Sequence, residues 1–254
     1  KVINSSVIKK KNFLTINLNS SQKIILIKIK NSQLTIENEK KGADFFEYIR
    51  TNSLTDITFL ENNIKSTSIA NKLFLDEFLH GLELKSYKFN KYKSKKEDEI
   101  YKIFVSFNTN TFNQTKSKKF HSLLQGIALT KDLVSEPGNI LHPDEYSKRL
   151  LKLKKNGLKV SVLNTKQLKK LGMNALLGVG QGSIRGSYLV IMEWRGAKSK
   201  EKPLAFVGKG VCFDTGGISL KPAKFIEDMT YDMAGSAVVV GLMKSLALRK
   251  AKVN

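Results

Sequence analysis

The first 115 residues alternate short runs rich in β-branched residues with stretches that have helical spacing. Runs typical of strands lie at residues 13–18, 23–29, 56–60 and 100–107. Residues 42–50 and 69–85 have the apolar spacing of helices. The alternation predicts a small α/β domain over residues 1–115. It ends in a polar segment rich in Asn and Thr, residues 108–115, which we interpret as a linker.

A helix is predicted over residues 116–135, because apolar side chains recur there every three or four positions. These side chains are Phe120, Leu123, Leu124, Ile127, Ala128 and Val134. Lys131 interrupts the stripe, and the segment from Ser135 to Asn139, which contains Pro137 and Gly138, ends it. We interpret this helix as the connection between two domains.

A second α/β pattern occupies residues 136–254. Pro143 begins a helix with Asp144 and Glu145 in its first turn, where the helix dipole favours anions, and Gly157 ends it. We expect strands at residues 158–163, 188–194 and 204–207, and helices at residues 165–171 and 232–249. Strands that alternate with helices favour a mainly parallel sheet. The chain is therefore predicted to be an α/β protein with a small N-terminal α/β domain, a linking helix and a mainly parallel α/β domain.

Composition leaves this picture unchanged. The 254 residues suffice for one or two domains, and a hydrophobic fraction of 41% is enough to build their cores. The longest apolar run, near residues 237–243, is far shorter than the ~20 residues that span a bilayer, so we expect no membrane association. Because the chain begins with Lys1 and its last four residues resemble the start of a strand, both ends look cut.

The formal net charge is +22, from 44 basic and 22 acidic residues. Such an excess can draw a protein to nucleic acid or to an anionic membrane. The basic residues are mostly lysines scattered through the first 120 residues, and no stripe of arginines interleaved with aromatic residues is present. We therefore expect nucleic acid not to be a partner. A basic nucleic-acid-binding protein stays open as the alternative, and a steep loss of affinity with salt would reveal it.

Cys212 is the single cysteine, so an internal disulfide is excluded and a reducing, cytoplasmic compartment fits the sequence. We expect Cys212 to be a small buried residue and not a nucleophile, since no histidine partner is evident. The three histidines, His80, His121 and His142, are scattered without a metal-binding spacing and are expected to be structural.

Candidate chemistry is concentrated between residues 207 and 235. The segment reads VGKGVCFDTGGISLKP from Val207 and MTYDMAG from Met229, directly after a predicted strand, where open α/β sheets bind ligands. Its glycines allow the backbone to approach a ligand closely. Two lysines and two aspartates share this apolar, Gly-rich region: Lys209, Asp214, Lys221 and Asp232. Buried charges must pair or bind a metal, and carboxylates are the expected ligands of hard cations.

The order and spacing of these four residues resemble the leucyl aminopeptidase family of two-metal exopeptidases. Asp214 follows Lys209 by five residues, Lys221 follows seven further on, and Asp232 follows eleven further on. Residues 81–93, 131–139 and 172–183 resemble other segments of the same family. The resemblance runs from about Glu77 to the end of the chain and is weak before that point.

The resemblance implies a role for each residue. Asp214 would bridge two divalent ions, Mn²⁺ or Zn²⁺, and Lys209 and Asp232 would help to bind the tighter one. A lysine ligand must be deprotonated, because only the neutral amine has a lone pair for a metal. Lys221 would stay charged and stabilise the oxyanion of the tetrahedral intermediate, while a metal-activated water attacks the peptide carbonyl. Met229 would line the pocket for the first side chain of the substrate.

The resemblance also implies a cytoplasmic homohexamer that removes N-terminal residues from peptides, with a leucine-type preference. The family carries a second motif, Asn-Thr-Asp-Ala-Glu-Gly-Arg, whose acids bind metal and whose Arg holds a bicarbonate. This motif does not occur in the 254 residues. We therefore expect residues 136–254 to be a truncated catalytic domain, and the isolated chain to be inactive.

Simpler interpretations exist for each part of the motif. Asp232 could cap a helix, Asp214 could form an Asx-turn, and the lysines alone would be surface residues. Asp214-Thr215-Gly216 also occurs in aspartic proteases, but these need two such carboxylates and the chain has one copy. The glycine-rich residues 178–183 lack the order of a phosphate-binding loop and are interpreted as a structural turn.

Overall fold

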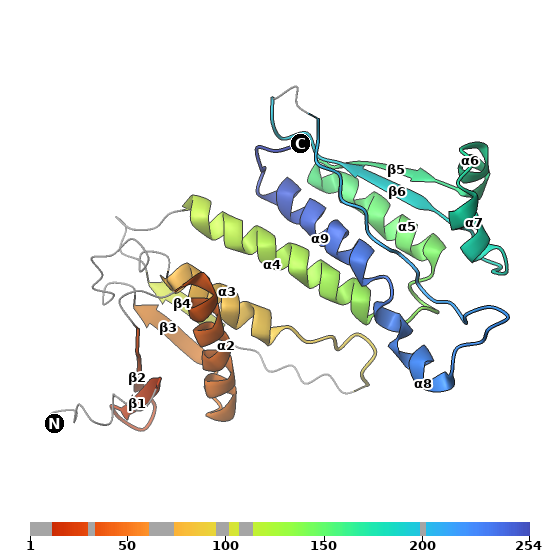
Figure 1. Ribbon diagram of the computed structural model, residues 1–254. Coiled ribbons are helices and arrows are strands. Elements are labelled where there is room, and N and C mark those ends of the chain that lie inside the picture. The colour runs from red at the N-terminus through yellow and green to blue at the C-terminus, as the bar shows by residue number, and fades with distance from the viewer. Residues whose placement is uncertain (1–11, 30–33, 61–73, 95–101, 107–113, 199–201) are drawn as a thin grey trace. The chain divides into compact units, whose positions relative to one another are not determined.

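The computed structural model describes residues 12–29, 34–60, 74–94, 102–106, 114–198 and 202–254 (Figure 1). Parts of several predicted elements, residues 69–73, 100–101 and 107–113, lie outside these ranges. Contacts divide the chain into two compact units, residues 1–114 and residues 115–254. Each unit is described by itself.

Unit 1 contains two pairs of strands and two helices. Strands β1 (Phe13–Asn17) and β2 (Lys23–Ile27) pair antiparallel, and β3 (Asp56–Leu60) pairs parallel with β4 (Lys102–Ser106). Helix α2 (Thr35–Thr51) begins earlier than predicted, because the Glu37 side chain accepts a hydrogen bond from the backbone N–H of Leu34 at 3.0 Å. Helix α3 (Phe74–Ser86) covers the described part of the second predicted helix.

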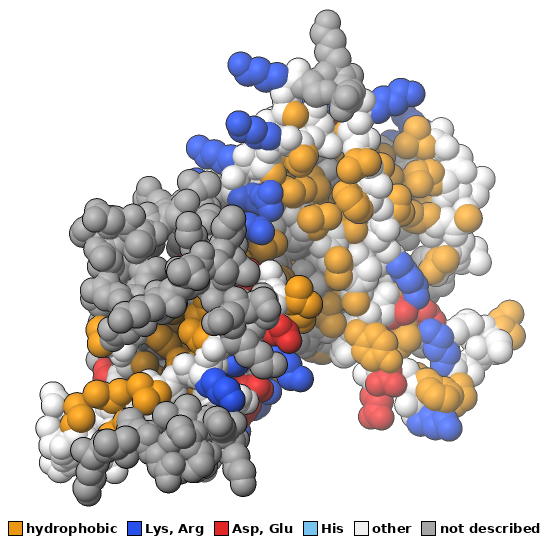
Figure 2. Space-filling model, turned by 60° about the vertical axis from the view of Figure 1, so that its left-hand side comes forward, with side chains coloured by type: hydrophobic (Ala, Val, Ile, Leu, Met, Phe, Trp, Pro, Cys, Tyr) orange, Lys and Arg blue, Asp and Glu red, His pale blue; other side chains and the backbone are white. Residues whose placement is uncertain are grey.

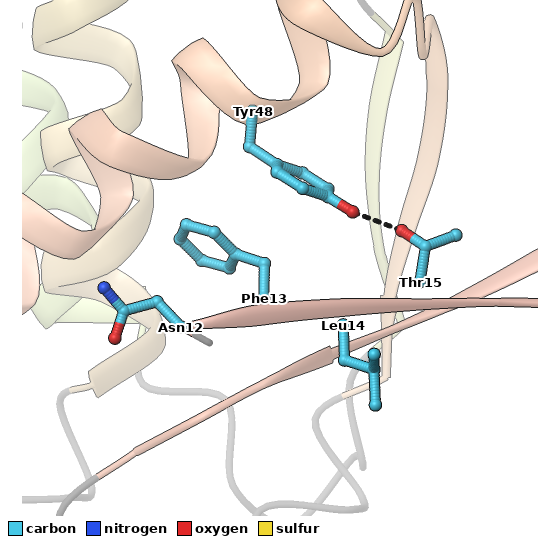
Figure 3. A pocket seen from close by; sticks show the side chains of 5 residues that line it. All are labelled: Asn12, Phe13, Leu14, Thr15 and Tyr48. Atoms are coloured by element: carbon cyan, nitrogen blue, oxygen red, sulfur yellow. Dashed lines mark hydrogen bonds between the residues drawn. The ribbon is translucent and has the colours of Figure 1, made fainter. Parts of the chain in front are cut away.

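The core of unit 1 is aromatic and lies where α2 and α3 pack closely. Phe45 and Phe78 are fully buried, with ring centroids 5.4 Å apart. Gly42 permits this approach, since a Cβ atom there would lie 1.9 Å from the carbonyl oxygen of Phe78. A separate hollow of about 440 Å³ lies between β1 and α2, where the hydroxyls of Thr15 and Tyr48 form a hydrogen bond (Figure 3). None of the predicted site residues lines that hollow.

Unit 2 begins with α4 (Gln114–Ser135), apart from its first residue, and contains most of the helices described. The other helices are α5 (Pro143–Leu151), η3 (Lys152–Asn156), α6 (Thr165–Lys170), α7 (Asn174–Gly180), α8 (Ala223–Ile226), η4 (Glu227–Tyr231) and α9 (Ala234–Leu248). Figure 1 shows α9 between α4 and α5. Leu133, Tyr146, Met233, Ala237 and Val240, from these three helices and the turn before α9, form the centre of the core.

The α/β class is confirmed, but the expected sheet direction is not found in the described part of unit 2. Strands β5 (Lys159–Leu163) and β6 (Leu189–Glu193) pair antiparallel. Residues 174–180, which overlap the glycine-rich segment interpreted as a turn, form helix α7. Gly157 follows η3 in the left-handed conformation, with φ of 89°, as expected of a residue that ends a helix.

The strand predicted at residues 204–207 is not formed. A strand needs a neighbour for its backbone hydrogen bonds, and within this stretch the bond found is from Leu204 N–H to the Asn254 carbonyl, at 3.3 Å. The apolar side chains of this segment are accordingly exposed, with Val207 at 97% and Leu204 at 78% of full exposure. Hydrophobic side chains lie at the surface of unit 2 in the view of Figure 2.

The stretch from Ala223 to Leu248 is long and apolar enough for a membrane span by length and composition alone, since it contains an 18-residue window with a mean hydropathy of 1.2. It is divided into α8, η4 and α9. Ala237, Val240 and Ala247 of α9 are buried in the core of unit 2. A core helix passes the same test, so the finding carries little weight for a membrane location.

The close contact between α4 and α9 predicts that a glycine-to-alanine substitution at the contact lowers stability. A Cβ atom at Gly241 would lie 2.1 Å from the hydroxyl oxygen of Thr130 and 2.6 Å from the carbonyl oxygen of Gly126. Gly241→Ala should therefore lower the free energy of unfolding by about 1–3 kcal/mol, because the helices must separate. Urea unfolding followed by circular dichroism measures the change.

Gly178 in α7 is the matched control, since a Cβ atom there would meet nothing within 4 Å. Gly178→Ala should leave the stability unchanged or raise it by about 0.5–1 kcal/mol, because alanine loses less backbone entropy in a helix. Equal effects of the two substitutions would contradict the packing described between α4 and α9.

Candidate metal-binding site

Two glycines let the loop that carries Lys209 lie directly on the first turn of α9. A Cβ atom at Gly208 would be 2.5 Å from the Cα of Ser236 and 2.6 Å from the carbonyl oxygen of Gly235. A Cβ atom at Gly235 would in turn be 3.2 Å from the backbone nitrogen of Lys209. Real side chains do not tolerate the first two distances, so backbone lies against backbone here. The backbone N–H of Ser236 donates to the carbonyl oxygen of Lys209 at 2.9 Å and fixes the register.

A tight turn orders the next part of the loop. Gly216 and Gly217 have φ of 89° and 78°, a left-handed conformation that favours glycine. The backbone N–H of Lys221 donates to the carbonyl oxygen of Thr215 at 2.9 Å, and the N–H of Gly216 donates to Oδ1 of Asp214 at 2.9 Å. Asp214 therefore makes the Asx-turn contact that its sequence context suggested. This contact occupies one carboxylate oxygen and leaves the other for a ligand.

The structure brings all five predicted site residues into one cluster. Nζ of Lys209 lies 2.5 Å from Oδ1 of Asp232, and Nζ of Lys221 lies 2.7 Å from Oδ1 of Asp214. Nζ of Lys221 also lies 3.3 Å from Sδ of Met229, which is buried. The backbone N–H of Asp232 donates to the carbonyl oxygen of Met229 at 3.2 Å. Asp232 precedes α9 and makes no side-chain cap there, so the interpretation of this residue as a helix cap is wrong.

The charges of the cluster compensate one another. The hydrogen bond from Lys221 holds the pKa of Asp214 below its ordinary value, and partial burial opposes this effect. The N–H of Gly216 and the charges of Lys221 and Lys209 lower the pKa further. Asp214 is therefore ionised at neutral pH, and two carboxylates face two amines.

The donor set fits a divalent cation in part. The contacts to both carboxylates fall on Oδ1, so among the described residues Oδ2 of Asp214 and Oδ2 of Asp232 accept no protein hydrogen bond. Carboxylate oxygens are suitable ligands for Mn²⁺ and Zn²⁺. Within the described residues, no three His, Cys, Asp or Glu side chains gather around one point. The cluster therefore supplies two carboxylates and the Lys209 amine, which is fewer ligands than two metal ions need.

The contacts of Cys212, His142 and His80 suit structural roles. Burial raises the pKa of the Cys212 thiol to about 11, and Cys212 is buried, as predicted. His142 accepts a hydrogen bond from the N–H of Glu145 at the start of α5, and His80 contacts Glu39 at 2.9 Å.

A contact between α5 and α9, which supports the cluster, was not predicted from the sequence. The hydroxyl of Tyr146, on α5, lies 3.0 Å from the hydroxyl of Ser236, on α9. These residues are 90 positions apart. Pro143 and the acidic first turn after it predicted the helix, but these local signals could not show which residue of α9 its tyrosine meets.

The protein is of the α/β class, and its cluster of two lysines and two aspartates lies in a glycine-rich loop beside the first turn of the core helix α9. Residues 128–254 match the cytosol aminopeptidase family, catalytic domain. A probable cytosol aminopeptidase of Brucella melitensis biotype 1 is 51% identical over 197 residues, which are 75% of this chain and 40% of that protein. The corresponding protein of Phytoplasma australiense is 53% identical over 180 residues, or 70% of this chain and 36% of that protein.

Solved structures agree with these sequence matches at the level of the fold. A tomato leucine aminopeptidase mutant superposes with a TM-score of 0.77 at 22% identity, over 96% of this chain and 48% of that one. The bottromycin maturation enzyme BotP in complex with Mn superposes with a TM-score of 0.76 at 20% identity, over 97% of this chain and 53% of that one. The chain belongs to the cytosol aminopeptidase family, and it spans about 40% of the length of the Brucella relative.

The contacts of Asp214 predict an order of pKa changes. Lys221→Met should raise the pKa of Asp214 more than Lys209→Met does, because the hydrogen bond from Lys221 is the largest cause of the lowered pKa and Lys209 acts only through its charge. Carbon-detected NMR titration of the Asp214 carboxyl in each variant measures the order. A larger rise in the Lys209 variant would contradict the geometry.

The same lowered pKa has a consequence for acid stability. Because the folded pKa lies below the unfolded one, the contribution of Asp214 is present above the unfolded value and is lost as the pH falls through the folded value. Asp214→Asn should therefore lower stability at pH 7 and reduce the loss of stability towards acid pH. Urea unfolding of both proteins at pH 3 and pH 7 measures this difference.

Proposed function

We propose that this chain is part of a metal-dependent aminopeptidase that removes N-terminal residues, leucine in particular, from peptides. One observation carries the proposal: Lys209, Asp214, Lys221, Met229 and Asp232 converge on one cluster, with amine-to-carboxylate distances of 2.5 and 2.7 Å. The convergence lies within the segment that matches the catalytic domain of the family. Residues that bind one metal and one substrate carbonyl must lie close together, and these residues do.

Lys209, Asp214 and Asp232 would hold the metal. The charges of both Lys221 and Lys209 lower the pKa of Asp214, which suits a residue that would bind two cations. The Lys209 amine contacts Asp232 in the structure, and it would hold the ion through its nitrogen lone pair. A bound divalent ion supplies a hydroxide from water at neutral pH. Mn²⁺ and Zn²⁺ both accept this mixture of oxygen and nitrogen donors.

Lys221 would bind the oxygen that becomes negative when the peptide carbonyl is attacked. Its ammonium group is a donor held on one side by Asp214 and on the other by the sulfur of Met229. A donor fixed before the reaction stabilises developing charge without a cost of reorganisation. Met229 would lie beside the same carbonyl, and its flexible thioether suits contact with an aliphatic first side chain.

The proposal also covers properties of the whole protein. These are a cytoplasmic location, a homohexamer and a bicarbonate ion in the active site. The relatives' name, cytosol aminopeptidase, supports the location. The hexamer and the bicarbonate rest on the family resemblance. Since the cluster has too few ligands for two ions, we propose that residues 1–254 alone do not hydrolyse peptides.

Purified residues 1–254 should therefore not release nitroaniline from leucine p-nitroanilide, even in the presence of excess Mn²⁺. Absorbance at the nitroaniline band, followed over hours, measures the rate. Turnover that EDTA abolishes and Asp214→Asn removes would overturn the proposed inactivity of the isolated chain, while leaving its assignment as an aminopeptidase standing.

In a protein of the full length of the relatives, substitutions of Lys221 and of a metal-binding aspartate should have different effects. Lys221→Ala should lower kcat by about 10²–10³, as loss of an oxyanion donor does, and leave the Mn²⁺ dissociation constant nearly unchanged. Asp214→Asn should abolish Mn²⁺ binding, since it removes the charge that bridges the ions. Steady-state kinetics and isothermal titration with Mn²⁺ measure the two effects.

Lys224→Ala is the matched control, because Lys224 lies close by but contacts the ring of Phe225 instead of a carboxylate, at 4.8 Å. It should change neither kcat nor the affinity for Mn²⁺. A Lys221 variant that behaves like this control would remove Lys221 from the mechanism.

A further inference from the structure

The two residues of the Lys209–Asp232 ion pair are joined through a third, Ser236. Its backbone N–H donates to the carbonyl oxygen of Lys209 at 2.9 Å. Its side-chain hydroxyl donates to the carbonyl oxygen of Met233 at 2.8 Å, next to Asp232 in the chain. One residue therefore connects the loop that carries the amine with the turn that carries the carboxylate.

The hydroxyl of Ser236 has a second partner, the hydroxyl of Tyr146 on α5, at 3.0 Å. A serine hydroxyl has a single hydrogen, and that hydrogen is given to Met233. The Tyr146 hydroxyl is therefore the donor, and Ser236 accepts. Tyr146 is 6% exposed and packs in the core of unit 2, so its ring is held in place. A shift of the first turn of α9 would therefore break the hydrogen bond between the two hydroxyls.

A further side chain holds the same turn from the opposite helix. The hydroxyl of Thr130, on α4, lies 3.0 Å from the carbonyl oxygen of Ala237 and 3.1 Å from that of Gly126 in its own helix, so its single hydrogen is shared between two acceptors. The first turn of α9 is thus bonded to α4, to α5 and to the loop of Lys209. Of the two side-chain bonds from neighbouring helices, the one from Tyr146 reaches Ser236, the residue whose backbone contacts Lys209.

We infer that Tyr146 is a positioning residue, which acts through Ser236 to hold the Lys209 loop beside the turn of Asp232, so that both side chains can reach a shared divalent ion. The inference rests on the proposed metal site. A metal ion gains affinity when its ligands are already placed, because less conformational freedom is lost on binding. Groups behind the ligands commonly change metal affinity by about 10-fold to 100-fold.

Tyr146→Phe tests the inference, because it removes one oxygen atom and keeps the buried ring. In residues 1–254 it should raise the dissociation constant for Mn²⁺, measured by electron paramagnetic resonance of the free ion, by about threefold to tenfold, at the low end for such supporting groups. Ser236→Ala should weaken binding at least as much, since it removes both hydroxyl contacts. An unchanged Mn²⁺ affinity in both variants would overturn the inference.

Tyr188→Phe is the matched control. Its hydroxyl donates to Oδ1 of Asp144 at 2.6 Å, so the same single atom is lost from another tyrosine hydrogen bond of unit 2. The control should bind Mn²⁺ as the unchanged chain does. A general loss of stability would weaken binding in the control and in Tyr146→Phe alike, and that result would count against a positioning role.

Amide hydrogen exchange provides a readout that needs no metal. Tyr146→Phe should speed exchange at the N–H of Ser236 by fivefold or more relative to the N–H of Val240, further along α9. If the unchanged chain binds no Mn²⁺, the proposed metal site fails, whereas the exchange at Ser236 still decides whether Tyr146 holds this turn. Equal exchange at Ser236 in the variant and the unchanged chain would overturn the inference.

Discussion

The contact between the Lys209 loop and the first turn of α9 is the constraint on which the candidate site depends. Gly208 brings two stretches of backbone together at distances that no side chain tolerates, and a Cβ atom at Gly235 would make a further close contact of 3.2 Å. The hydrogen bond from Ser236 to Lys209 then fixes their register. An amine and a carboxylate that are 23 residues apart in the chain meet at 2.5 Å as a result. Lys209 is itself an exposed lysine in a strongly basic protein, and this contact gives it a carboxylate partner.

Charge pairing explains how the cluster is tolerated in the described structure. Each aspartate contacts one lysine, so the cluster is close to neutral although the chain as a whole carries +22. The pairs lie in a partly exposed loop, where such contacts contribute little stability. Their contribution is to hold the carboxylates and amines of the site beside one another. The exposed apolar side chains of the same segment, such as Val207 and Ile218, gain nothing from this arrangement.

The sequence predicted those features that depend on local pattern or on the family motif. Pro143 begins α5, residues 56–60 form a strand, and each aspartate of the predicted site contacts one of its lysines. It failed where the outcome depends on distant partners. Residues 204–207 have the composition of a strand but lack a neighbour along most of their length, and composition does not specify a neighbour. The direction of β6 beside β5 and the meeting of Tyr146 with Ser236 are set by tertiary packing, which apolar spacing does not encode.

The central claim is that Lys209, Asp214 and Asp232 share a divalent ion, and anomalous diffraction tests it most directly. Crystals of the protein soaked in MnCl₂ would be measured above the manganese absorption edge. The account predicts an anomalous peak at a coordination distance of about 2 Å from a carboxylate oxygen of Asp214 and one of Asp232. Ordered side chains at these positions with no peak between them, at saturating Mn²⁺, would contradict it.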